Sequence, residues 1–137
     1  MDRYNGDALG LFRAFRAASR LYVQPGVIAS PTDTQQVSRL LRYASERKIP
    51  VVPYGGGTGV MGGAASVENC VVLNLQRMNA ILSVSAEDMS VAAQPGVVLE
   101  DLASTLKHSG LLLGHDPWSR PIATVGGAIS TDGMGYT

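Results

Sequence analysis

Cysteine is almost absent from the sequence. The single Cys70 allows no disulfide within the chain, and it lies in the apolar run Cys70-Val71-Val72-Leu73, where a buried, unreactive thiol is expected. The two histidines and the scattered carboxylates show none of the spacings by which proteins bind zinc, so no metal site is expected. These shortages exclude a fold held by internal disulfides and favour a reducing, cytoplasmic location.

Net charge and long apolar runs are absent as well. Lysine plus arginine and aspartate plus glutamate number 11 each, so no basic field favours nucleic acid or an anionic membrane. No apolar run approaches the roughly 18 residues that cross a bilayer, and the first residues lack the pattern of a signal peptide. We therefore expect one soluble domain, without nucleic-acid partners or a membrane span, in which any anion is held by local backbone dipoles.

Glycine, in contrast, is concentrated in one place. Six of the nine residues from Gly55 to Gly63 are glycine, directly after the apolar run Val51-Val52-Pro53. Glycines add nothing to a core and lose more backbone entropy on folding than other residues, so this run is expected to serve through its backbone. Successive N–H groups that point into one concavity bind phosphate oxygens. The segment therefore predicts a nucleotide pyrophosphate site; the alternative is a glycine-rich turn without a ligand.

Two well-known phosphate loops do not explain this segment. The P-loop pattern requires a lysine after its second glycine, and here Gly57 and Gly62 are followed by Gly63. Residues 57–62 do match the dinucleotide fingerprint GxGxxG, but the residues after them show no helical spacing, and the next strand-like run ends in Asn74-Leu75-Gln76 without the acidic residue. The match is therefore interpreted as accidental.

The first half of the chain alternates between helix and strand patterns. The clearest helix begins at a capping box of Thr32 and Gln35, has apolar residues at helical spacing and ends before Pro50. The other expected elements are a helix at residues 9–18 and strands at 27–29, 51–53 and 70–75. Two short strands around a helix form a β-α-β unit, whose strands should run parallel with a right-handed crossover.

The second half has a different pattern. Two strand-like runs flank Ala86-Glu87-Asp88 and predict a hairpin, and therefore antiparallel pairing. The elements expected here are the hairpin strands 81–85 and 89–93, a helix at 99–108, a buried strand at 111–113 and a helix at 124–131. The last helix starts with almost no side-chain bulk at Gly126 and Gly127, which predicts a second anion or cofactor platform.

Four motifs with a fixed order carry a family resemblance. They are Pro31 with its capped helix, the run from Val51 to Gly59, the hairpin followed by Gln94-Pro95-Gly96-Val97, and the run from Thr124 to Thr131. In this order they resemble the PCMH-type FAD-binding domain of the vanillyl-alcohol oxidase family, whose most similar members by motif are glycolate oxidase, D-lactate dehydrogenase and alkyldihydroxyacetonephosphate synthase.

The resemblance implies an α+β fold of the PCMH type. A small parallel β-α-β subdomain at about residues 22–75 would be followed by an antiparallel α+β subdomain at about 78–137, with FAD extended between them. The whole chain, residues 1–137, would then be a single truncated FAD-binding domain that is incomplete at its C-terminus.

The resemblance also implies which residues bind FAD. The glycine loop would hold the pyrophosphate through its main chain, a second segment from Trp118 to Thr124 would run along the flavin, and Thr131 to Met134 would supply a third stretch. The expected cofactor-binding residues are Pro53, Tyr54, Gly55, Gly56, Gly57, Thr58, Gly59, Trp118, Ser119, Thr124, Gly126, Gly127, Thr131 and Gly133. Some relatives tether FAD through a histidine in the glycine loop; Thr58 stands at that position and cannot form the bond, so non-covalent FAD is expected.

Two side chains near the second segment leave alternatives open. Trp118 is expected either to stack on a ligand or to fill a gap in the fold. His115 and Asp116 are adjacent, and adjacent side chains rarely form a productive catalytic pair, so a structural or flavin-edge role is favoured over hydrolytic chemistry. No residue is assigned as catalytic, and His108 is interpreted as a charge at a helix C-terminus.

The function implied by the resemblance is that of the FAD-binding portion of a flavin-dependent oxidoreductase, inactive on its own. A 2-hydroxy acid such as glycolate or D-lactate is the favoured substrate; an alcohol, an aldonolactone or an ether-lipid precursor stays open. The small-molecule substrate would be bound through a C-terminal domain that this sequence lacks, and an oligomer is possible. The alternative is a non-catalytic nucleotide-binding or assembly module derived from the same fold.

Overall fold

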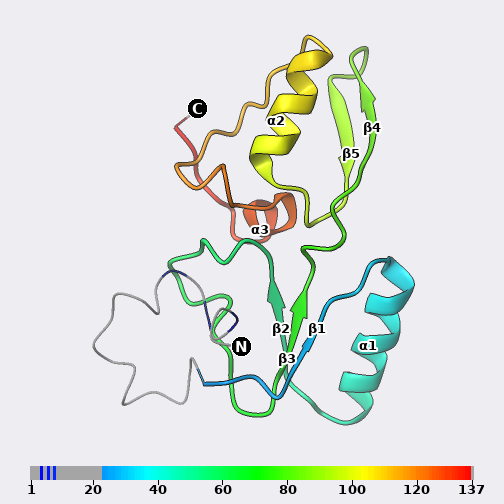
Figure 1. Cartoon of the computed structure of the whole chain (residues 1–137), viewed down its shortest axis with the longest axis vertical. Coiled ribbons are helices and arrows are strands. Elements are labelled where there is room, and N and C mark those ends of the chain that lie inside the picture. The colour runs from blue at the N-terminus through cyan, green and yellow to red at the C-terminus, as the bar shows by residue number, and fades with distance from the viewer. Residues whose placement is uncertain (1–3, 5, 7, 9–22, 137) are drawn as a thin grey trace.

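The computed structural model describes Tyr4, Gly6, Ala8 and residues 23–136. The helix expected at residues 9–18 therefore lies outside the described residues. The elements are β1 (Val27–Ala29), α1 (Thr34–Glu46), β2 (Val51–Tyr54), β3 (Val71–Asn74), β4 (Ile81–Ser85), β5 (Ser90–Ala93), α2 (Leu99–His108) and α3 (Val125–Ser130), as labelled in Figure 1.

The first three strands form a parallel sheet in the order β1-β3-β2. Val71 of the central strand aligns with Val27 on one side and Val51 on the other. The predicted parallel β-α-β unit is confirmed, with β3 placed between its two strands. Strand β3 is the most deeply buried because both of its edges are paired, and Val72 and Cys70 are fully buried. Cys70 thus has the position expected of a structural thiol.

Helix α1 begins one residue later than its predicted capping box. Asp33, in extended conformation, is the N-cap, and its carboxylate accepts a hydrogen bond of 2.8 Å from the N–H of Gln36. The predicted pair of Thr32 and Gln35 is therefore wrong. The sequence contains two overlapping cap patterns, and the aspartate cap also provides a negative charge at the positive end of the helix. The Gln36 side chain accepts from the N–H of Thr32 instead.

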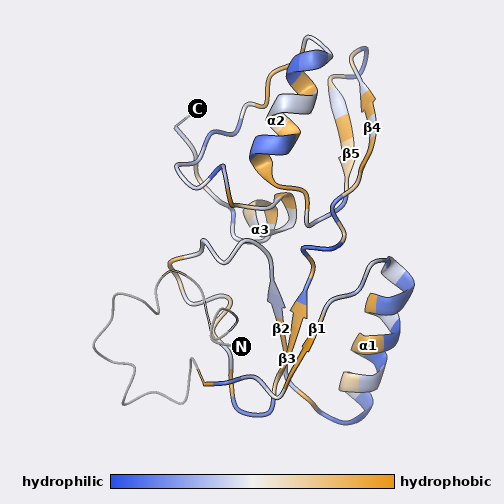
Figure 2. Ribbon diagram, in the orientation of Figure 1, coloured by the Kyte–Doolittle hydropathy of each residue, from blue (hydrophilic) through white to orange (hydrophobic). Residues whose placement is uncertain are grey.

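The second sheet is the predicted hairpin. Strands β4 and β5 pair antiparallel, and the side chain of Ser85 donates a 2.7 Å hydrogen bond to Asp88 in the turn. Helix α2 covers one face of this hairpin, where Leu102 and Leu106 are buried with Val97. Figure 2 shows hydrophobic residues along much of β1, β3 and β4, and both hydrophilic and hydrophobic stretches on α1 and α2.

The strand expected at residues 111–113 does not form. The segment pairs with no strand among the described residues, and the N–H of Leu111 bonds to the carbonyl of Leu106 at the end of α2. Leu111 and Leu113 pack partly buried against the cluster under α2, whereas Leu112 is 89% exposed. An apolar run of three residues can form a strand or an extended segment that packs on a helix. Which of the two forms depends on the elements that lie beside it.

The parallel sheet and the hairpin layer stack along the long axis of the molecule, with α3 between them (Figure 1). The carboxyl ends of β2 and β3 face this junction, and the chain crosses it once on its way from β3 to β4. The longest helix in the described part of the chain has 13 residues, and none is long and apolar enough to cross a membrane. The fold therefore brings two chain segments to the junction, the loop after β2 and the loop before α3.

Candidate functional site

The loop from Gly55 to Gly59 leaves the carboxyl end of β2 and enters the junction. All five residues are half-buried, and none of their N–H groups donates a hydrogen bond to another described residue. Unpaired N–H groups are costly when water is partly excluded, so a run of five is a site for an acceptor such as phosphate. A loop without lysine binds a pyrophosphate mainly through its N–H groups, and this loop has them available.

Gly57 has a backbone conformation that favours glycine. Its φ is +69°, in the left-handed region, and a Cβ at this position would collide with the hydroxyl group of Tyr54. The Tyr54 ring is 96% buried and forms an edge-to-face contact with Tyr4, with centroids 5.0 Å apart. The Tyr54 side chain therefore packs against the loop from the inside of the protein. Of Tyr54, only the main chain is available to a ligand.

The second predicted segment packs directly against this loop. A Cβ on Gly56 would collide with the carbonyl oxygen of Ile122, and a Cβ on Gly55 would collide with the hydroxyl of Thr124. The turn that presents these groups is closed by hydrogen bonds of 2.9 and 2.8 Å from Ile122 and Ala123 to the carbonyl of Ser119. The structure thus brings together the two segments predicted to bind FAD, and it gives Gly55 and Gly56 a packing reason that the ligand argument missed.

The start of α3 is not the free N–H platform expected from its sequence. The N–H groups of Val125 and Gly126 donate to the carbonyls of Val97 and Pro95, at 2.8 and 2.9 Å. A Cβ on Gly126 would lie 2.7 Å from the Cβ of Pro95, so this glycine permits close packing. The free donors expected at Gly126 and Gly127 are not present, because the Gly126 N–H bonds to the Pro95 carbonyl and the Gly127 N–H to the Thr124 hydroxyl. The Gly126 N–H is therefore not available to a ligand, and Gly126 can favour a ligand only because it has no side chain to obstruct one.

The remaining predicted cofactor residues lie around the same junction with different surroundings. Trp118 is 88% exposed, so it does not fill a gap and its ring is open to stacking. Ser119 is half-buried, and Thr124 is 98% buried with its hydroxyl oxygen accepting from Gly127. The Thr131 hydroxyl donates to the carbonyl of Gly127 at 2.9 Å. Pro53 is exposed, and Gly133 closes the end of α3 through a 2.9 Å bond from its N–H to Ala128.

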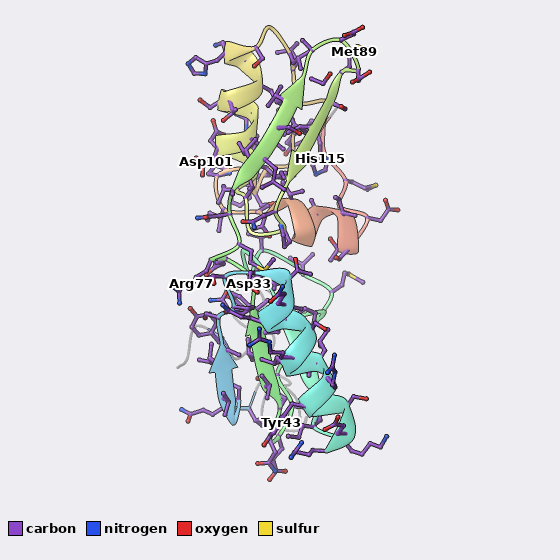
Figure 3. The ribbon with its side chains drawn as sticks, turned by 90° about the vertical axis from the view of Figure 1, so that its right-hand side faces the viewer. Asp33, Tyr43, Arg77, Met89, Asp101 and His115 are labelled. Carbon is purple, nitrogen blue, oxygen red and sulfur yellow. The ribbon has the colours of Figure 1, made fainter. Side chains whose placement is uncertain are left out.

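His115 and Asp116 do not form a hydrogen-bonded pair. The Asp116 carboxylate accepts from Arg120 Nη1 at 2.9 Å, and the buried Nε2 of His115 has no partner among the described residues. Figure 3 shows His115 in the upper part of the molecule, well away from Asp33 at the start of α1. The described residues contain no group of three metal-ligating side chains. Asp116 is therefore paired with Arg120 and not with His115.

Arg120 forms a cluster that no local pattern in the sequence revealed. Besides Asp116, its guanidinium donates to Glu100 of α2, with 2.6 Å between Nε and Oε2. The hydrogen bond with Glu100, and then the charge of Asp116, raise the pKa of Arg120 above its ordinary value, so the group stays charged at physiological pH. Its partners are 4 and 20 residues away in the sequence, and the contact with Glu100 becomes visible only in the folded chain, where α2 lies beside the loop.

A half-open cavity lies on the α2 side of the same junction. Its volume is about 260 Å³. It is lined by residues of the β3–β4 connection, the start of β4, the segment from β5 into α2 and the N-cap of α3: Gln76, Asn79, Ile81, Gly96, Val97, Val98, Asp101 and Thr124. Thr124 thus borders both this cavity and Gly55. No sequence motif indicated the polar lining residues as a group.

Comparison with known proteins assigns the chain to a family. The model of the FAD binding domain family matches residues 25–137. The chain belongs to this family. The predicted family, its α+β fold and FAD as its cofactor are confirmed. The unpaired N–H groups of the Gly55–Gly59 loop fit a pyrophosphate, so the residues present suit this cofactor.

Two curated relatives show which proteins the chain is similar to. It is 34% identical over 125 residues to glycolate oxidase subunit GlcD of Bacillus subtilis (strain 168), covering 91% of this chain and 27% of that protein. It is 40% identical over 112 residues to D-lactate dehydrogenase of Anaerostipes hadrus, covering 82% of this chain and 23% of that protein. The chain therefore spans about a quarter of the length of these relatives.

A solved structure of alkyldihydroxyacetonephosphate synthase shows the same fold. It superimposes with a TM-score of 0.72 at 33% sequence identity, over 79% of this chain and 22% of that one.

Proposed function

We propose that the chain is the FAD-binding portion of a flavin-dependent oxidoreductase and that the Gly55–Gly59 loop holds the pyrophosphate of FAD. The observation that carries the proposal is a run of five half-buried residues, 55–59, at the carboxyl end of a parallel strand, whose N–H groups donate to no other described residue. When bound, the flavin would accept the hydride, and with it the two electrons, that the substrate loses. The family assignment supports the same cofactor.

The residues of the chain would hold the anion without a cationic side chain. The net charge is zero, so attraction must come from dipoles close to the phosphate oxygens. The loop would provide these dipoles, and the lack of side chains at Gly55, Gly56 and Gly57 lets its main chain pack closely against Thr124, Ile122 and Tyr54. Trp118 and Ser119, on the neighbouring segment, would contact the remainder of the cofactor from the exposed side of the turn.

We propose that the cofactor is bound non-covalently. Thr58 is the side chain of the loop at the position where some members of the family carry the tethering histidine, and a threonine hydroxyl does not form that bond. The cofactor should therefore leave the protein when the chain unfolds.

A 2-hydroxy acid is the proposed substrate class of the whole protein. The support comes from relatives named glycolate oxidase subunit and D-lactate dehydrogenase, which are 34% and 40% identical to this chain. The described residues contain no paired acid and base beside the loop, since Asp116 bonds to Arg120 and not to His115. The substrate-binding groups are therefore assigned to a part of the protein other than these residues.

Competition experiments with fragments of FAD test which part of the cofactor the loop holds. FAD binding to the purified chain is followed by quenching of flavin fluorescence, and inorganic pyrophosphate, ADP or riboflavin is then added. We expect ADP and pyrophosphate to displace FAD, because they carry the anion that the N–H groups bind, and riboflavin to compete far more weakly. Displacement by riboflavin alone would contradict the assignment of the loop to the pyrophosphate.

A further inference from the structure

Arg120 lies within the segment 118–124, but neither it nor its two carboxylate partners are among the residues that the family resemblance names for FAD. Its guanidinium joins two carboxylates, Glu100 on the first turn of α2 at 2.6 Å and Asp116 at 2.9 Å. A guanidinium presents its donors in a fixed planar fork and can engage two carboxylates at once, which an ammonium group does less well. The cluster therefore connects the helix to the start of the loop that contains Trp118.

Backbone hydrogen bonds also tie this loop to the same helix, at Arg120 and at the end of the loop. The N–H of Glu100 donates to the carbonyl of Arg120 at 3.2 Å, and the N–H of Leu99 donates to Ala123 at 2.9 Å. The first turn of α2 thus holds Arg120 through its side chain and its main chain, and Arg120 in turn holds Asp116 at the start of the segment 116–123. Only the main-chain part would survive the loss of the arginine.

A displacement of this segment would reach the glycine loop. The carbonyl of Ile122 and the hydroxyl of Thr124 lie so close to Gly56 and Gly55 that neither glycine has room for a Cβ. Close-packed groups transmit small shifts because no free volume absorbs them. The position of the segment 118–124 therefore determines the position of the N–H groups of Gly55 and Gly56.

We propose that Arg120 is a positioning residue for FAD: it joins α2 to the loop 116–123 and so fixes that loop where it packs against Gly55 and Gly56. This inference rests on the proposed function of the Gly55–Gly59 loop. In this proposal Arg120 does not bind the phosphate itself, because the two carboxylates that accept from its Nε and Nη1 together outweigh its single positive charge.

Three variants separate positioning from direct binding. Arg120→Met removes the fork and keeps an apolar stem, Glu100→Gln keeps the shape and removes one charge, and the third variant combines both changes. We expect each single change to weaken FAD binding by about threefold to tenfold, and the double variant to be no weaker than Arg120→Met, because both changes break one connection. If Arg120 bound the phosphate directly, Glu100→Gln would instead leave FAD binding unchanged or strengthen it, which would overturn the proposal.

A matched control is provided by Arg47, which pairs with Glu46 at 3.5 Å and lies over the Tyr43 ring at the end of α1. Arg47→Met should leave FAD affinity unchanged. The melting temperature of the free chain should change little in all variants, because the ion pairs are partly exposed. The visible spectrum of the bound flavin should shift in Arg120→Met and not in Arg47→Met, a readout that general stability does not move.

The outcomes distinguish this inference from the proposed function. A wild-type chain that binds no FAD would overturn the proposed function and this inference with it. A wild-type chain that binds FAD, with the same affinity in Arg120→Met and Glu100→Gln, would overturn the inference alone. Since Glu100→Gln preserves size and hydrogen-bonding shape, it remains informative even where Arg120→Met impairs folding.

Discussion

Three adjacent glycines in the loop are required for different reasons. Gly57 adopts a left-handed φ above the Tyr54 hydroxyl, whereas Gly55 and Gly56 face the segment before α3. One short run of glycines therefore satisfies a turn and a close approach between two segments. From the sequence, the density of glycine was interpreted as access of a ligand to the main chain.

The packing role of Gly56 gives a prediction for stability. Gly56→Ala places a Cβ against the Ile122 carbonyl, which is backbone and cannot rotate away, so we expect the free energy of unfolding to fall by about 1 to 3 kcal/mol. Gly63→Ala is the matched control, because nothing lies within 4 Å of a Cβ built there. Urea unfolding of both variants measures the difference. Equal stability of the two would show that the segments are not in close contact.

At the scale of elements, local patterns predicted most of the secondary structure. The β-α-β unit, the hairpin and helices α2 and α3 all follow from periodicity, turn residues and caps, which act over a few residues. The order β1-β3-β2 was not specified, because pairing partners are chosen by packing. The prediction of a strand at 111–113 was wrong for the same reason. Its apolar residues pack against the cluster under α2, and no described strand pairs with them.

The candidate site was predicted in part. The glycine loop and the segment 118–124 were found because an unusual density of glycine, or a family motif, marks them along the chain. Two contacts of the site join residues that lie 20 or more positions apart. Arg120 donates to Glu100, and the Gly126 N–H donates to the carbonyl of Pro95. No local pattern encodes such contacts, so only the folded chain reveals them.

The observed cap of α1 gives a prediction at this scale. Asp33→Ala removes the carboxylate that accepts from Gln36, and we expect it to lower the free energy of unfolding by about 1 kcal/mol. Thr32→Ala serves as the control and should cost clearly less, because the Thr32 hydroxyl accepts from the exposed Gln36 side chain at 3.0 Å, whereas Asp33 accepts from a main-chain N–H. Chemical denaturation of both variants compares them. A larger loss of unfolding free energy in Thr32→Ala than in Asp33→Ala would instead support the capping box of Thr32 and Gln35 that the sequence predicted.

At the scale of the whole molecule, the candidate site belongs to neither sheet alone. The parallel sheet supplies the glycine loop at its carboxyl edge, and the α2 layer supplies the segment that packs on it, with α3 between the two (Figure 1). Ligands commonly bind at the carboxyl ends of parallel strands, where backbone groups are left unpaired. The central claim is therefore that the pyrophosphate of FAD lies on the main chain of the Gly55–Gly59 loop at this junction.

The most direct measurement compares FAD affinity in two glycine variants with the same backbone strain. Gly57 and Gly110 both have a left-handed φ, +69° and +73°, but a Cβ on Gly57 meets the buried Tyr54 hydroxyl and one on Gly110 meets nothing within 4 Å. Both Gly57→Ala and Gly110→Ala should lose about 1 kcal/mol of stability from the positive φ. Titration of each chain with FAD, followed by flavin fluorescence, should show affinity reduced at least about tenfold in Gly57→Ala and unchanged in Gly110→Ala. Equal FAD affinity in the two variants would contradict the assignment of the pyrophosphate to this loop.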